Sequence, residues 1–384
     1  MFYRPAAVVA SLAALVAIGS SYTAPSAVAS EIKTENLSVR FGVRLQSRID
    51  IPAAVDNAAG DSVGLDGGAE EYDFDMYMRR IRLAIRGTYM EDTNYNLTLS
   101  ADNLGRNGDG DFTETVRSND RMDPTVRYAW VSHRIKSGDL THTIKFGLDK
   151  PWFVSSDTDS SSRTLFPNGR PLGGQFAGDR TVGLSYRLSA PMVNFGADIM
   201  PARNDSRNLQ ITARAETSLQ EEWKMRRTES MLGKEGFGHV LGVEVGTRTE
   251  SETDDDGWFQ FGIDYNVHWN NITANIDLIV RNQETAGDSQ TQFGFTAQAG
   301  YAIPLDTGHV VEPALRIGFF DYDEEGDIGL ATREDVDSGI QVDAGVNYYI
   351  NGHNNKFQFA ISHWSADEGD AQKTVLRLQH QLNF

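Results

Sequence analysis

The stretch Phe259-Gln260-Phe261-Gly262-Ile263-Asp264-Tyr265-Asn266-Val267-His268-Trp269 alternates between apolar and polar residues. A period of two places the two kinds of side chain on opposite faces of an extended strand, whereas the stripe of a helix would repeat every 3.6 residues. The following stretch, Ile272–Arg281, repeats the alternation, with its apolar residues at even positions and polar residues between most of them. This part of the chain therefore predicts amphipathic β-strands separated by a very short turn.

The same alternation recurs along the chain from residue 36 onward. The polar faces carry arginine, glutamine, asparagine and aspartate, which are too polar for a dry core and require water. Tyrosines and tryptophans stand near several segment ends, as in the aromatic girdles of membrane barrels: Tyr89, Tyr95, Trp130, Tyr186, Tyr265, Trp269, Tyr301, Tyr348 and Tyr349. We therefore expect an all-β fold, a transmembrane antiparallel β-barrel of about 16 strands, in preference to a soluble all-β protein. The alternating segments start near residues 36, 73, 93, 123, 140, 179, 191, 207, 238, 257, 271, 290, 309, 336, 355 and 372.

The connections differ in length. Ser189–Pro191, Trp269–Asn271 and Asp306–Gly308 are short, which is typical of periplasmic turns. Longer connections are expected on the extracellular side, and several of them are acidic. We interpret these as a solvated rim, with bridging of divalent cations to lipopolysaccharide as an additional role. The longer connections are 50–72, 103–122, 149–178, 218–237, 249–257, 282–290, 321–335 and 365–371.

The amino terminus has the features of an export signal. Arg4 precedes an apolar run from Pro5 to Gly19, and Ala27-Val28-Ala29 has the small-x-small pattern of a cleavage site. We expect residues 1–29 to be a signal peptide and residues 30–384 to form one outer-membrane barrel domain of a Gram-negative bacterium. No apolar stretch near 18 residues follows, so no transmembrane helix is expected.

The carboxyl terminus also points to the outer membrane. Leu376, Leu378, Leu382 and Phe384 share one face of the last alternating segment. A final strand that ends in an aromatic residue resembles the signal by which the outer-membrane assembly machinery recognises its substrates. We therefore expect Phe384 to act as an assembly signal and to lie on a strand that closes the barrel against the segment starting near residue 36.

Two stretches resemble the phosphate-selective porin O and P family. Met78-Arg79-Arg80-Ile81-Arg82-Leu83-Ala84-Ile85-Arg86-Gly87-Thr88 is similar to that family's arginine-rich second strand. Lys145–Phe153 and Ser161–Phe166 are similar to its G-x-x-K-x-P-F strand end and to the following segment of its inward-folded loop. The resemblance implies a homotrimeric, water-filled porin of 16 strands. It also implies that the third long loop, about residues 149–178, folds into the lumen as a constriction.

Basic residues on the polar faces are the candidates for selectivity, because charges at the constriction decide which ions pass. Arginine suits small anions such as phosphate, since its planar guanidinium binds their oxygens at two points. The alternative is a weakly selective general porin, in which the arginines pair with Asp102, Asp198, Glu216, Glu244, Asp264, Asp277 and Asp343. The candidate pore-lining and anion-binding residues are Arg40, Arg44, Arg48, Arg80, Arg82, Arg86, Arg127 and Lys145, with Lys150, Arg163 and Arg170 on the inward loop.

Other chemistries have little support. The chain has eight histidines without metal-ligand spacing and no cysteine, so no catalytic residue, metal site or cofactor is expected. Asn107–Asp111 resembles part of a calcium loop but lacks the distal glutamate, and an ordinary turn is preferred. A catalytic outer-membrane barrel such as a phospholipase is the unlikely alternative. With a net charge of −19, no nucleic-acid partner is expected.

Overall fold

The protein is seen in a computed structural model, which describes residues 31–56, 75–105, 124–154, 162–168, 176, 180–201, 208–218, 228–249, 257–285, 288–321, 338–366 and 372–384. The expected signal peptide, the turn at Asn107–Asp111 and Arg170 lie outside these residues, as do most of the acidic connections. Among the described residues, no helix is long and apolar enough to cross a membrane.

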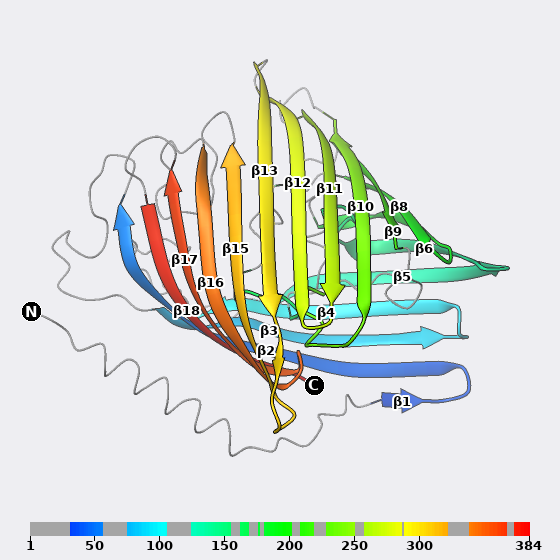
Figure 1. The fold of residues 1–384 in the computed structure, drawn as a ribbon. Coiled ribbons are helices and arrows are strands. Elements are labelled where there is room, and N and C mark those ends of the chain that lie inside the picture. The colour runs from blue at the N-terminus through cyan, green and yellow to red at the C-terminus, as the bar shows by residue number, and fades with distance from the viewer. Residues whose placement is uncertain are drawn as a thin grey trace, which may run out of the picture.

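The described chain is a single antiparallel sheet that closes on itself, with sixteen long strands (Figure 1). This confirms the predicted barrel, and each strand starts within a few residues of its predicted position. Two short strands, β1 (Glu31–Lys33) and β14 (Ile303–Pro304), extend the wall locally. The long strands are β2 (Leu37–Asp56), β3 (Asp75–Tyr89), β4 (Thr93–Leu104), β5 (Thr125–Ser137), β6 (Leu140–Asp149), β7 (Thr181–Ser189), β8 (Val193–Pro201), β9 (Leu209–Thr217), β10 (Phe237–Arg248), β11 (Gly257–Trp269), β12 (Ile272–Thr285), β13 (Asp288–Tyr301), β15 (Val310–Asp321), β16 (Ser338–Asn351), β17 (Asn355–Ala366) and β18 (Gln372–Asn383).

The barrel closes where β18 pairs with β2, and Figure 1 shows the red final strand beside the blue first one. Phe384 continues the pairing: its amide donates to the Val43 carbonyl at 3.0 Å, and its carbonyl accepts from the Val43 amide at 2.6 Å. Beyond that point β1 pairs with β2, with Lys33 opposite Ser38. The terminal residue therefore lies on the closing strand, as predicted, and β1 covers the next part of the β2 edge.

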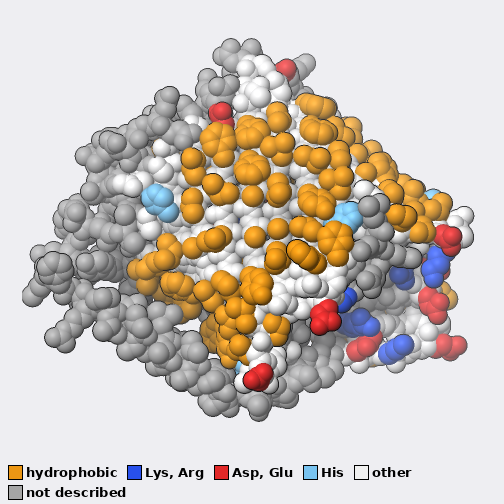
Figure 2. Space-filling view, viewed as in Figure 1, with side chains coloured by type: hydrophobic (Ala, Val, Ile, Leu, Met, Phe, Trp, Pro, Cys, Tyr) orange, Lys and Arg blue, Asp and Glu red, His pale blue; other side chains and the backbone are white. Residues whose placement is uncertain are grey.

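The distribution of side chains is the reverse of that in a soluble protein. Large apolar residues are exposed on the outer face, including Leu315 at 66% and Phe146 at 64%. In Figure 2 a broad field of hydrophobic side chains covers the strands facing the viewer, and the charged side chains lie outside this field. Gln260 and Gln358, in contrast, are completely buried inside the barrel. This arrangement suits a wall with lipid outside and a polar interior.

The two ends of the barrel differ. Short connections such as Tyr89–Thr93, Trp269–Ile272 and Asn351–Asn355 gather at the end that also holds Phe384, which is the periplasmic end by the usual length rule. The predicted girdle residues Tyr89, Trp269 and Tyr301 lie on exposed positions at this end. Two other aromatic residues were assigned to the girdle wrongly, because their cross-strand partners place them inside the barrel. These are Trp130, opposite Asn96, and Tyr349, which donates to Glu312.

One long connection lies at the opposite end from the predicted one. The β9–β10 connection, predicted as an extracellular loop at 218–237, begins with Ser218 bonded to Met192 and ends with Gly236 bonded to Asn270. Met192 and Asn270 belong to short turns, so this connection is periplasmic. The reason is topological, because antiparallel strands alternate in direction and successive connections therefore alternate between the two ends of the barrel. The β8–β9 connection, after Pro201, is extracellular, so the β9–β10 connection must be periplasmic.

Candidate channel lining and constriction

The loop after β6 folds into the barrel. Its described parts are 150–154, 162–168 and Phe176, and its apolar side chains pack against the inner wall. Phe153 stacks on Trp258 of β11 at 5.9 Å between ring centres, and both belong to one buried cluster with Phe176, Ile279 and Phe320. A second cluster joins Leu165 and Phe166 to Ala314 of β15 and Ala360 of β17. The apolar side chains of the inward loop, which was predicted near 149–178, therefore pack against β11, β12, β15 and β17.

Glycines in the wall make room for the apolar side chains of this loop. A Cβ at Gly246 would lie 2.6 Å from the Phe153 ring, and one at Gly300 would lie 2.9 Å from Leu165. A Cβ at Gly345 would lie 3.2 Å from the Phe166 ring, and one at Gly196 would collide with the Trp152 ring. Contacts below 3.0 Å are not tolerated without movement of the neighbour. The small residues on β8, β10, β13 and β16 therefore determine where the loop can dock.

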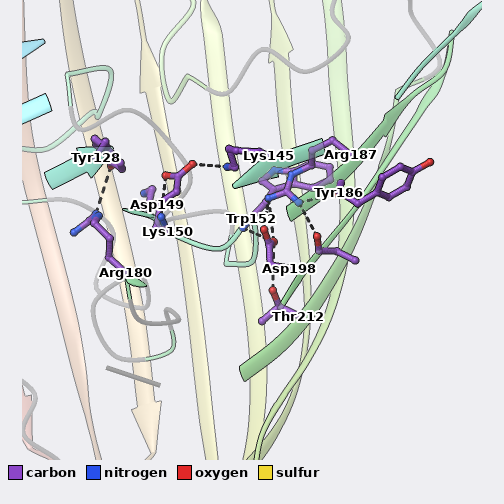
Figure 3. Close-up of polar contacts among 11 residues, drawn as sticks. Tyr128, Lys145, Asp149, Lys150, Trp152, Arg180, Tyr186, Arg187, Asp198 and Thr212 are labelled. Carbon is purple, nitrogen blue, oxygen red and sulfur yellow. Dashed lines mark hydrogen bonds and ion pairs between the residues drawn. The ribbon is translucent and has the colours of Figure 1, made fainter. Parts of the chain in front are cut away.

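Polar side chains of the wall bind the loop backbone. Lys356 and Gln358 of β17 donate to the Thr164 carbonyl at 2.9 Å and 3.1 Å, and Gln381 of β18 donates to the Ser162 carbonyl at 3.0 Å. At the other end of the loop, the Trp152 amide donates to Asp198 at 2.9 Å (Figure 3). Burying backbone carbonyls without partners would be costly, so these bonds fix the loop in one position.

A row of arginines lines the part of the wall that is formed by β2 and β3. Arg44 of β2 stands directly opposite Arg82 of β3, and Arg40 stands opposite Arg86. In the ring of strands, β3 lies half a turn from β11, to which the inward loop docks. Like charges placed opposite each other on neighbouring strands destabilise a sheet. The register therefore places Arg40, Arg44, Arg82 and Arg86 together on one face of the wall, at a cost to the stability of the sheet.

The partners of these arginines are mostly neutral. Arg80 donates to Gln46 at 2.8 Å and Arg86 donates to Asn96 at 3.4 Å. Arg44 donates to Asn383 and to Ser162, each at 3.1 Å. Arg48 donates to Gln379 at 2.7 Å and to the Pro167 carbonyl. These bonds hold the guanidinium groups of β2 and β3 close together, which concentrates positively charged side chains on this part of the wall.

Carboxylates reach the remaining predicted cations. Asp102 bridges Arg82 at 2.9 Å and Arg127 at 3.4 Å, so two cations share one carboxylate. Arg40, at the periplasmic end of β2, pairs with Glu31 of β1 at 3.0 Å, and its side chain is largely exposed. The Arg40 charge is thus offset at the periplasmic mouth, whereas the cluster around Asp102 keeps a net positive charge.

The start of the inward loop and the strand before it hold two of the predicted lysines (Figure 3). Lys145 forms an ion pair with Asp149, and the Lys150 amide donates to the same carboxylate at 2.8 Å. Arg163, further along the loop, is exposed, and its carbonyl accepts from the Glu229 amide at 3.1 Å. Lys150 and Arg163 therefore lie on the inward loop, whereas Lys145 lies on β6 and its charge is paired with Asp149.

Three of the predicted acidic residues, Glu216, Glu244 and Asp264, lie on a different part of the wall and pair with an arginine outside the predicted set. Arg214 of β9 is buried and binds Glu216 at 2.9 Å, Glu244 at 2.8 Å and Asp264 at 2.5 Å. Its guanidinium also donates to the Phe153 carbonyl at 3.1 Å, beneath the inward loop. Three carboxylates around one guanidinium leave excess negative charge at this part of the wall, and the inward loop lies over it.

Several lumen cations were absent from the predicted set. The alternation that identified Arg80 and Arg82 also places these further cations on the inner face. The sequence alone does not distinguish the cations that support the inward loop from those that line the channel. Most of them support the inward loop: Arg316 stacks on Phe166 at 4.6 Å and pairs with Asp343 at 2.7 Å. Arg180 differs, because it faces Tyr128 at 5.0 Å beside Arg127. The additional inward cations are Arg180, Arg187, Arg214, Arg281, Arg316, Lys356 and Arg377.

Comparison with known proteins identifies the family. The sequence profile of the phosphate-selective porin O and P family matches residues 56–275, more than half of the chain. The chain belongs to the phosphate-selective porin O and P family. The match includes both stretches on which the resemblance was first noted. A comparison with curated protein sequences gave no match.

Solved porins share the fold of this family member. The anion-selective porin from Comamonas acidovorans is 13% identical, with a TM-score of 0.56 over 91% of this chain and 100% of its own. The outer-membrane channel DcaP of Acinetobacter baumannii is 12% identical, with a TM-score of 0.55 over 93% and 100%. The trimer form of OmpT from Vibrio cholerae is 11% identical, with a TM-score of 0.56 over 91% and 100%. The protein is therefore an outer-membrane porin, a channel for passive diffusion of small solutes.

Proposed function

We propose that the porin favours small anions, phosphate among them, over cations. The observation that carries this proposal is the register of β2 and β3, which sets Arg44 opposite Arg82, with Arg44 also donating to Ser162 of the inward loop. Like charges on directly opposed residues destabilise a sheet, so the stability of the barrel does not explain this pair. Its role in the channel would be to lower the electrostatic energy of a passing anion.

The weakly selective alternative is that lumen arginines are paired with carboxylates, as Arg214 is with those of β9–β11. Three carboxylates surround this one guanidinium, and their excess charge would attract cations. However, Glu216, Glu244 and Asp264 are at most 4% exposed, whereas Arg86 and Arg163 are exposed. Permeating ions meet the exposed arginines and not the enclosed carboxylates, which favours anions. The structurally similar porin from Comamonas acidovorans is anion-selective, which supports this preference.

Reversal potentials in planar bilayers test the proposal. The full-length porin is inserted into a bilayer that separates two concentrations of potassium chloride. A potential of the sign set by chloride supports an anion-favouring channel. A potential set by potassium would refute it and leave the weakly selective or cation-favouring channel. Repeating the measurement at high salt provides a control, since screening should reduce selectivity that arises from fixed charges.

We also propose that the porin assembles as a homotrimer within the outer membrane. Support comes from the trimer form recorded for OmpT and from the exposed apolar face of the barrel. Chemical cross-linking of detergent-extracted protein should give a trimer that dissociates on heating. A monomer at all cross-linker concentrations would contradict the proposal.

The remaining proposals concern export and the surroundings of the barrel. We propose that export removes residues 1–29, that the assembly machinery reads Phe384, and that the acidic extracellular connections contact lipopolysaccharide. Amino-terminal sequencing of the membrane-inserted protein should begin at Ser30. Replacing Phe384 with alanine should reduce the amount of folded barrel in the outer membrane without changing the amount exported.

A further inference from the structure

The β9–β10 connection enters the lumen from the periplasmic end. It leaves the barrel wall at Ser218 and rejoins it at Gly236, both beside short turns. Between these points, residues 228–232 reach the β16–β17 turn, where Ser230 and Thr228 contact His353 at 3.1 Å and 3.4 Å. Strands β11, β12, β13 and β15 lie between β10 and β16 in the ring. Residues 228–236, here called the periplasmic strap, therefore cross the mouth of the channel.

The strap is anchored to the wall by buried polar contacts. Ser230 donates to Glu312 of β15 at 2.8 Å, and Tyr349 of β16 donates to the second oxygen of that carboxylate at 2.5 Å. Leu232 and Gly233 then adopt positive φ values of 57° and 75°, which turn the chain back toward β10. A positive φ is uncommon for leucine, so the tight reversal is held by the surrounding contacts. The strap thus has a defined position.

The strap is also bonded to the inward loop. The Glu229 amide donates to the Arg163 carbonyl at 3.1 Å, and the Glu229 carboxylate accepts from the Leu165 amide at 2.8 Å. Glu229 is only 1% exposed. Lys356, which holds the Thr164 carbonyl, interacts electrostatically with Glu229 and Glu312. The two segments that enter the lumen, one from each end, therefore meet at the Arg163–Leu165 part of the inward loop.

We propose that the periplasmic strap is a latch that holds the inward loop, with Glu229 as its positioning residue. Glu229 contacts the backbone on both sides of Thr164, next to the exposed cation of Arg163. Fixing this part of the loop fixes the width of the channel and the place of the Arg163 charge. This role concerns the steadiness of the open channel and is independent of which ions the channel favours.

Single-channel recording of the full-length porin tests the latch. Glu229→Ala removes the acceptor for the Leu165 amide, and the expected result is a loss of the steady open level, with larger current fluctuations than in the wild type. Glu229→Gln keeps an acceptor oxygen and should restore the steady level. Glu235→Ala is the matched control, because it removes an exposed carboxylate from the same strap without a contact to the loop.

A second variant covers the case in which Glu229→Ala does not fold. Ser230→Ala leaves Glu229 in place but removes the donor to Glu312, so it should also increase the current fluctuations. Steady currents in both Glu229→Ala and Ser230→Ala, equal to those of Glu235→Ala, would overturn the proposal. If Glu229→Ala gives no folded barrel, a steady current in Ser230→Ala alone would overturn it. The reversal potential of the wild type tests anion preference separately, so failure of one proposal does not resemble failure of the other.

Discussion

Arg44 and Arg82 are direct cross-strand partners on the lumen face of β2 and β3. Arg44 donates to Asn383 and Ser162, and Arg82 pairs with Asp102, so the two guanidinium groups are held close together. The pair is unfavourable for the sheet, because like charges on opposing residues repel. The Arg44–Arg82 pair should therefore increase the anion preference of the channel and decrease the stability of the barrel.

Replacing both residues with glutamine, Arg44→Gln with Arg82→Gln, should lower anion preference and shift the reversal potential toward that of potassium. The same change should raise the free energy of unfolding by about 0.2–1 kcal/mol, since the repulsion of a like-charge pair is removed. Bilayer recording and heat-induced unfolding in detergent measure the two effects. Arg134→Gln is the control, because Arg134 donates to the Glu91 carbonyl at the periplasmic turn. Equal shifts of the reversal potential in the double variant and in Arg134→Gln would show that the position of the removed charge does not matter.

Phosphate should compete with chloride for the arginine row. Adding phosphate at constant chloride should reduce the chloride current if a phosphate ion is held by several guanidinium groups, since such pairs bind its oxygens at two points. Replacing Arg80, Arg82, Lys150 and Arg163 one at a time with alanine should weaken this block. Unchanged block in all four variants would place the phosphate site elsewhere in the channel.

The docking of the inward loop can be tested through Gly246. A valine there would overlap the Phe153 ring, and overpacking of this kind typically costs about 1–3 kcal/mol. Gly246→Val should therefore displace the loop and increase single-channel conductance. Gly42→Ala is the matched control within the lumen, because its new Cβ would lie 3.7 Å from the Phe384 carbonyl oxygen, an ordinary contact. Wild-type conductance in Gly246→Val would mean that the loop does not narrow the channel.

His353 should make the barrel sensitive to acid. It lies in the β16–β17 turn, where burial, and then the charge of Lys356, lower its pKa to about 3. The folded state therefore keeps His353 neutral, while the unfolded chain binds a proton below its ordinary pKa of about 6.5. This histidine's contribution to stability is complete above pH 6.5 and is lost as the pH falls toward 3, by up to about 1.4 kcal/mol per pH unit.

The measurement for this prediction is the pH dependence of thermal unfolding between pH 3 and pH 7. His353→Gln should flatten the dependence, because glutamine does not titrate. His133→Gln provides a comparison, since His133 is exposed on the outer face of β5. The idea fails if wild type and His353→Gln lose stability equally across this range.

The alternation of residues was sufficient to predict the barrel and its strands. Strand β11 shows the reason: each apolar residue from Phe259 to Val267 faces outward and each polar residue faces inward, so the wall is encoded locally. The family resemblance, carried by Met78–Thr88 and Lys145–Phe153, likewise predicted an inward loop. These features depend on neighbours in sequence or on short motifs.

Contacts between distant segments could not be predicted in this way. The β9–β10 connection was placed on the wrong side because its length was taken as a sign of its location, whereas strand direction determines it. Arg214 could be placed inward by alternation, but its three carboxylate partners come from β9, β10 and β11. The meeting of Glu229 with Leu165 joins two loops through side-chain and backbone contacts that leave no periodic pattern.

The glycines under the inward loop have a consequence for protein engineering. The bore of this channel is specified by two sets of residues far apart in the chain: the rings of Trp152, Phe153 and Phe166, and the hollows at Gly196, Gly246 and Gly345. A graft of the loop into another porin would transfer the rings without the hollows. Such a chimera would need matching glycines on its own strands before the transplanted loop could reproduce the original pore size.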